Sequence, residues 1–127
     1  MKLYTGEITH SGLYEESWFI QDVLAKAGVQ TIDVCCAFGV DVDHPLFAKT
    51  IEVEVSKLSD CLRQHEDAGA FRLGHTNISL TYDFDHVGLK FSFGNDNDIF
   101  CEGNDSPGLR DILKRWQRRY PSSGCMS

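Results

Sequence analysis

Two short stretches, D-V-D-H at residues 41–44 and D-F-D-H at residues 83–86, repeat one pattern of two aspartates and a histidine. Residues two apart on a strand point to the same side, so each stretch could present two carboxylates and an imidazole together. Those groups are ligands of hard or borderline divalent cations. The same stretches also lie where strands are expected to end, and Asp is frequent in turns because its side chain bonds nearby backbone N–H groups. We favour the turn interpretation and keep a small metal-dependent enzyme as the alternative.

Other motifs lack residues that their chemistry requires. Residues 95–98 alternate Asn and Asp as a calcium loop does, but Phe100 and Ser106 stand where the loop needs Gly and Glu. Residues 103–108 form a Gly-flanked stretch before a predicted helix, without the Lys of a phosphate-binding loop. The chain also lacks the G-x-S-x-G pattern of a hydrolase nucleophile and the paired C-x-x-C of many zinc sites. The sequence therefore predicts a hairpin turn and a capped helix at these places, with no catalytic residues, no cofactor and no metal.

Cysteine content and hydropathy indicate the compartment. The odd number of five cysteines disfavours a disulfide framework, and we expect Cys36, Cys61 and Cys101 in the core and Cys125 exposed. No stretch reaches the roughly 20 apolar residues of a membrane span, and the first residues lack the apolar run of a signal peptide. These features predict a cytoplasmic protein with no membrane partner.

Charge is distributed unevenly along the chain. The 12 basic and 19 acidic residues give a net charge of −7. Through Leu109 there are 7 basic and 18 acidic residues, a net charge of −11, whereas 5 basic and 1 acidic residues from Arg110 onward give +4. An acidic body repels the phosphate backbone and attracts basic proteins, so we expect a basic protein partner and no nucleic acid. Greater solubility is the plain alternative explanation of the acidic surface.

The basic final segment could itself touch nucleic acid, with Trp116 or Tyr120 stacking on a base. Trp116, however, continues the apolar stripe of that segment, which places it in a core. We therefore expect the basic residues to be solvated or paired with acids of the body.

Hydrophobic periodicity places the elements. Apolar residues at helical spacing predict helices over residues 15–27, 56–67 and 107–119. The third has the clearest start, because Ser106 can cap it and Pro107 suits the first helical position. Period-two alternation predicts strands over residues 3–8, 31–42, 50–55, 78–84, 89–93 and 99–102.

This order predicts an α+β fold. Alternation within the strands implies one buried and one solvated face, so we expect a mainly antiparallel sheet of five or six strands with about three helices packed on one face. Residues 1–120 are expected to form a single domain, and residues 121–127 a flexible C-terminal tail.

The strand at residues 98–102, Gly103 and the helix at 109–119, within a small acidic chain, resemble the immunity proteins of bacterial toxin systems such as contact-dependent inhibition. The resemblance implies an α+β domain that neutralises a toxin, typically a nuclease, by binding it tightly. It rests on organisation and charge, so no functional residue is carried over from the family.

A nuclease site is basic because it holds phosphates, and an acidic surface can occupy it. The partner-binding candidates are outward acids beside aromatic residues: Glu15, Glu16, Asp41, Asp43, Asp83, Asp85, Asp96 and Asp98. The alternatives that stay open are a metal-dependent enzyme built on the D-x-D-H stretches, and a ligand-binding domain with a pocket between sheet and helices.

Overall fold

The computed structural model describes residues 1–36, 49–84 and 87–126. It contains three α-helices, one short 3₁₀ helix and seven strands. The helices are α1 (His10–Lys26), η1 (Val55–Lys57), α2 (Leu58–Asp67) and α3 (Pro107–Arg119). The strands are β1 (Lys2–Tyr4), β2 (Thr31–Cys36), β3 (Thr50–Glu54), β4 (Ile78–Phe84), β5 (Val87–Phe93), β6 (Ile99–Glu102) and β7 (Gly124–Met126).

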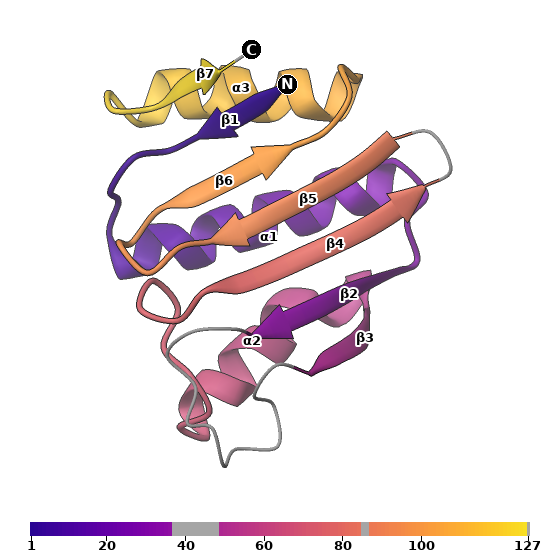
Figure 1. Ribbon diagram of the computed structural model, residues 1–127, viewed down its shortest axis with the longest axis vertical. Helices are drawn as coiled ribbons and strands as arrows, with labels where there is room; N and C mark the ends of the chain where they lie inside the picture. The colour runs from indigo at the N-terminus through magenta and orange to yellow at the C-terminus, as the bar shows by residue number, and fades with distance from the viewer. Residues whose placement is uncertain (37–48, 85–86, 127) are drawn as a thin grey trace.

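The strands form one antiparallel sheet in the order β3-β2-β4-β5-β6-β1-β7. The three α-helices form one layer behind this sheet, with α1 across its middle, α2 behind β2 and β3, and α3 at the β7 end (Figure 1). The α+β prediction, with a mainly antiparallel sheet and helices on one face, is confirmed. The sheet has seven strands, slightly more than the five or six expected.

Register explains why one face of the sheet is buried. Ile32 pairs with Val53, and Val34 with Ile51, so apolar side chains of adjacent strands lie on the helix side. The intervening positions, including Thr31, are exposed on the other side. No helix among the described residues covers this second face, which we call the open face.

Helix α1 begins earlier than its apolar spacing predicts. The side chain of Thr9 accepts a hydrogen bond from the backbone N–H of Gly12 at 3.0 Å and so starts the helix at His10. The first turn has few apolar residues, so apolar spacing alone places the start of the helix too late in the sequence. The predicted stop is confirmed, since Gly28 follows the helix with a positive φ of 82°.

Helix α3 follows its sequence signals closely. Ser106 caps it by accepting from the N–H of Leu109, and Pro107 is its first residue. Ile112 and Trp116 are buried with Leu109 along one stripe. The prediction that Trp116 belongs to the core is confirmed.

The end of the chain differs from the predicted flexible tail. Gly124–Met126 form β7, which pairs with β1. Gly124 lies so close to the Tyr4 hydroxyl that a Cβ there would overlap it. A three-residue strand shows no alternation of its own, and β7 forms because β1 presents a free edge.

Candidate functional site

Glu16 is not an outward acid as predicted. Its side chain is 0% exposed and lies between α1 and α3. The Arg115 guanidinium donates to both carboxylate oxygens at 2.8 and 3.0 Å, Trp116 Nε1 donates at 2.8 Å, and the Tyr120 hydroxyl donates at 2.6 Å. Burial and the hydrogen bond to Glu16 raise the pKa of Tyr120 to about 12. Glu16 is therefore an internal anchor for the last helix and cannot contact a partner.

Ion pairs also neutralise much of the basic final helix. Arg119 bonds the exposed Glu15, and Arg110 makes a two-pronged contact with Asp105 at 2.7 and 2.8 Å. With the Arg115–Glu16 pair, three of the five basic residues of α3 are matched by acids of the same chain. This agrees with the expectation that these cations pair with acids of the body.

Of the other predicted contact residues, four have side chains that the structure does not describe. Asp41, Asp43 and Asp85 lie outside the described residues, and for Asp83 only the backbone position in β4, opposite Gly88, is described. The metal-site alternative at the two D-x-D-H stretches is therefore untested. Among the described side chains, no group of three His, Cys, Asp or Glu residues could hold a metal ion.

Asp96 and Asp98 lie in the turn between β5 and β6. The predicted turn is confirmed, and Asn97 adopts a positive φ of 54° there. Asp96 is exposed, whereas Asp98 is half-buried, and its Oδ1 has no hydrogen-bond partner among the described residues. Burial and the neighbouring Asp96 charge raise the pKa of Asp98.

The open face carries an acidic pair that the sequence analysis did not single out. Asp33 of β2 lies directly opposite Glu52 of β3, and both are exposed. Glu54 follows on the same face, opposite Thr31. Alternation in the sequence places each acid outward, but only the strand pairing and register bring the two carboxylates together.

Farther across the open face, the charges alternate. Glu102 of β6 lies between two lysines, Lys90 on β5 and Lys2 on β1, each directly opposite it in the strand register. The Lys2 Nζ atom is 3.9 Å from Glu102 Oε1. Among the described side chains of this face, negative charge is therefore concentrated at the β2–β3 end, where Glu54 also pairs with Lys57 at 3.5 Å. We call Asp33, Glu52 and Glu54 the acidic corner.

The acidic corner has a predicted cost to stability. Like charges directly opposite on adjacent strands are destabilising, so Asp33→Asn and Glu52→Gln should each raise the free energy of unfolding by about 0.2–1 kcal/mol. Chemical denaturation of the two variants measures this. Glu102→Gln is the matched control, because Glu102 has lysine neighbours on the same face and its neutral variant should gain nothing. A loss of stability in both corner variants would contradict the prediction.

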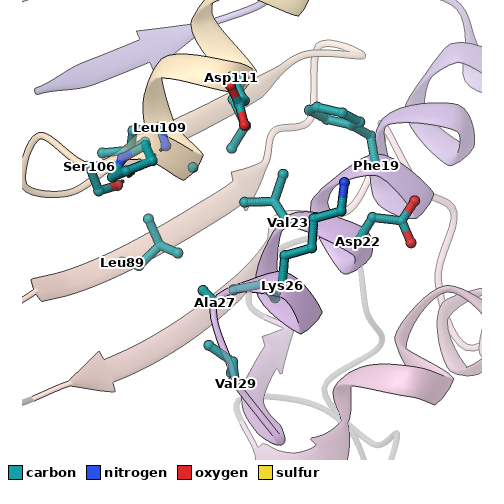
Figure 2. Close-up of a pocket in the computed structure, with 14 residues that line it drawn as sticks. Phe19, Asp22, Val23, Lys26, Ala27, Val29, Leu89, Ser106, Leu109 and Asp111 are labelled. Atoms are coloured by element: carbon teal, nitrogen blue, oxygen red, sulfur yellow. Dashed lines mark hydrogen bonds between the residues drawn. The ribbon is translucent and has the colours of Figure 1, made fainter.

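A pocket of about 570 Å³ opens between α1 and the start of α3, with Leu89 of β5 beside it (Figure 2). Its apolar lining consists of Phe19, Val23, Leu24, Ala27, Val29, Leu89, Leu109 and Ile112. Asp22, Lys26 and Asp111 add charged groups. The helix start offers few donors to an anion, because Pro107 has no N–H and Ser106 caps the N–H of Leu109. The pocket suits an apolar group better than a phosphate.

A partly buried carboxylate joins α1 to α2. Glu66 accepts hydrogen bonds from His10 Nε2 at 2.7 Å, the Tyr14 hydroxyl at 2.5 Å and the backbone N–H of Leu73 at 3.0 Å. Arg63 stacks on the Tyr14 ring with its guanidinium carbon 4.1 Å from the centroid. Burial alone would raise the pKa of Glu66, but the hydrogen bonds from Tyr14 and His10 outweigh it and lower the pKa. These contacts use three of the roughly four acceptor sites of the carboxylate, so Glu66 serves as a structural link between α1 and α2.

The lowered pKa of Glu66 predicts a pH-dependent contribution to stability. The contribution is complete above the unfolded-state pKa of about 4.3 and is lost as pH falls through the lower folded-state value. Glu66→Gln should therefore unfold more easily than wild type at neutral pH, and the gap should narrow below about pH 4. Thermal unfolding between neutral and acidic pH measures the gap. A gap that stays constant over this range would contradict the assignment.

Comparison with known protein families, with characterised proteins and with solved structures finds no match to this chain. No helix in the described part of the chain is long and apolar enough to cross a membrane.

Proposed function

We propose that this protein is an acidic binding module for a basic protein, most simply an immunity protein that neutralises a toxin domain by occupying its basic site. The observation that carries the proposal is the Asp33–Glu52 pair on the open face. Two carboxylates directly opposite each other weaken the free protein, and a cationic partner surface would remove that repulsion.

The distribution of the other charges supports a protein partner. The basic helix α3 is matched largely by Glu15, Glu16 and Asp105, so it offers little free positive charge to a nucleic acid. The chain as a whole keeps a net charge of −7. A field of this sign steers a basic protein toward the acidic surface and raises its association rate at low salt.

Co-expression with the product of the adjacent gene tests the proposal. We expect a basic protein to co-purify, and we expect cells that express that protein alone to be inhibited until this chain is supplied. An adjacent product that neither binds nor inhibits growth would count against the immunity function. Turnover of a small substrate that is lost on Asp83→Asn would instead favour the metal-dependent enzyme.

The pocket between α1 and α3 favours a second candidate, a ligand-binding domain. Its volume of about 570 Å³ lies within the usual range for small-molecule sites, and its lining is mainly apolar. Val23→Trp would fill it from the α1 side. If this variant folds and still binds the basic partner, the pocket is not required for the proposed protein-binding function.

A further inference from the structure

Strand β3 is an edge of the sheet, and its register with β2 shows which of its backbone N–H and C=O groups point away from the sheet. The N–H of Val55 donates to the carbonyl of Gln30 at 2.9 Å, next to the β2–β3 ladder. Bonded and non-bonded pairs alternate in an antiparallel ladder, so the backbone groups of Ile51 and Val53 face β2. By the same alternation, the N–H and C=O of Glu52 point away from the sheet. No described strand pairs with them.

A groove of about 530 Å³ runs beside this edge, between β3 and α2. Its lining consists of the β3 residues Ile51, Glu52, Val53 and Glu54, together with Lys57, Asp60, Cys61 and Gln64. Ile51 and Val53 give it an apolar wall on the helix side of β3, while Glu52 and Glu54 project on the open face. An added strand would thus meet the apolar Ile51 and Val53 on the groove side, next to the polar side chains of η1 and α2, and carboxylates on the open face.

We propose that β3 accepts an extended segment of the basic partner as an eighth strand, with basic side chains over the acidic corner and alternate apolar side chains in the groove. This mode of recognition obtains affinity from backbone hydrogen bonds and specificity from alternate side chains. It deepens the proposed function by naming the surface and the kind of segment that binds there. A second copy of this chain is a poor occupant, because two β3 strands would bring their glutamates together.

The test uses a short labelled peptide of alternating lysine and valine, measured by fluorescence anisotropy and by shifts of the β3 amide signals in NMR spectra. A peptide of the same composition with its lysines and valines in two blocks keeps the charge and loses the alternation. A third peptide, N-methylated at alternate residues, cannot donate the backbone hydrogen bonds. We expect the alternating peptide to bind at least about tenfold more tightly than either control.

Two variants at one position separate charge from backbone pairing. Glu52→Gln removes the charge and keeps the N–H, so it should weaken peptide binding a few-fold and reduce its salt dependence. Glu52→Pro also removes the outward N–H, which the β2–β3 ladder does not use, so it should weaken binding about tenfold beyond Glu52→Gln. Circular dichroism and thermal unfolding confirm that both variants fold, and the N-methylated peptide tests the same bond on unaltered protein.

Equal binding of all three peptides would overturn strand addition and leave only general attraction between opposite charges. A native basic partner that binds wild type and Glu52→Pro equally would also overturn it, while leaving the proposed function intact. A failure of the proposed function gives a different result: the alternating peptide binds to β3, but no native basic protein binds to the chain.

Discussion

Trp116→Ala is expected to lower the free energy of unfolding by about 3–5 kcal/mol. Trp116 is 1% exposed and is among the largest fully buried side chains, so its removal leaves a large cavity under α3. It also removes the buried hydrogen bond that the Trp116 indole N–H donates to Glu16 Oε1 at 2.8 Å. Urea denaturation followed by circular dichroism gives the change, which is a large part of a typical domain stability of about 5–15 kcal/mol.

The chain supplies its own control for this prediction. Trp18, on α1, is 46% exposed, so Trp18→Ala should change the stability by no more than about 0.5 kcal/mol. If the two tryptophan variants lose the same stability, α3 does not pack as described.

Glu16→Gln is expected to cost about 3 kcal/mol, although it keeps the shape of the side chain. The variant leaves the Arg115 guanidinium, only 20% exposed, without its charge partner. Breaking a buried pair is costly because the remaining charge stays desolvated. Thermal or urea unfolding measures the loss.

The adjacent residue is the matched control for Glu16. Glu15 also pairs with an arginine of α3, Arg119, but both side chains are about half exposed. Glu15→Gln should cost less than about 1 kcal/mol, as surface ion pairs do. Adding Arg115→Met to Glu16→Gln should recover part of the loss, since it removes the unpaired charge. Equal costs at positions 15 and 16 would contradict the internal placement of Glu16.

Local signals were sufficient for much of the fold. Two adjacent residues, Ser106 and Pro107, indicate the start of α3, and alternation in residues 31–36 and 50–54 indicates which face of each strand is buried. Features that depend on a distant partner were not predictable in this way. The strand β7 exists because β1 offers it an edge, and three residues carry no periodicity of their own.

The candidate site shows the same division. Glu15 and Glu16 look alike in the sequence, and only the packing of α1 on α3 makes one exposed and the other buried. Exposure of Asp33 and Glu52 follows from alternation, but their direct opposition requires the β2–β3 register. No pattern within either strand indicates which residues will face each other across the gap between them.

The most direct test of the acidic corner is the association rate with the basic partner, measured by stopped flow at low and moderate salt. For the Asp33→Asn, Glu52→Gln double variant we expect a slower rate at low salt and a weaker salt dependence than wild type, together with greater stability of the free protein. Asp111→Asn, at an exposed acid on α3, controls for the loss of general negative charge. A double variant that associates at the rate of Asp111→Asn under both salt conditions would contradict binding through the acidic corner.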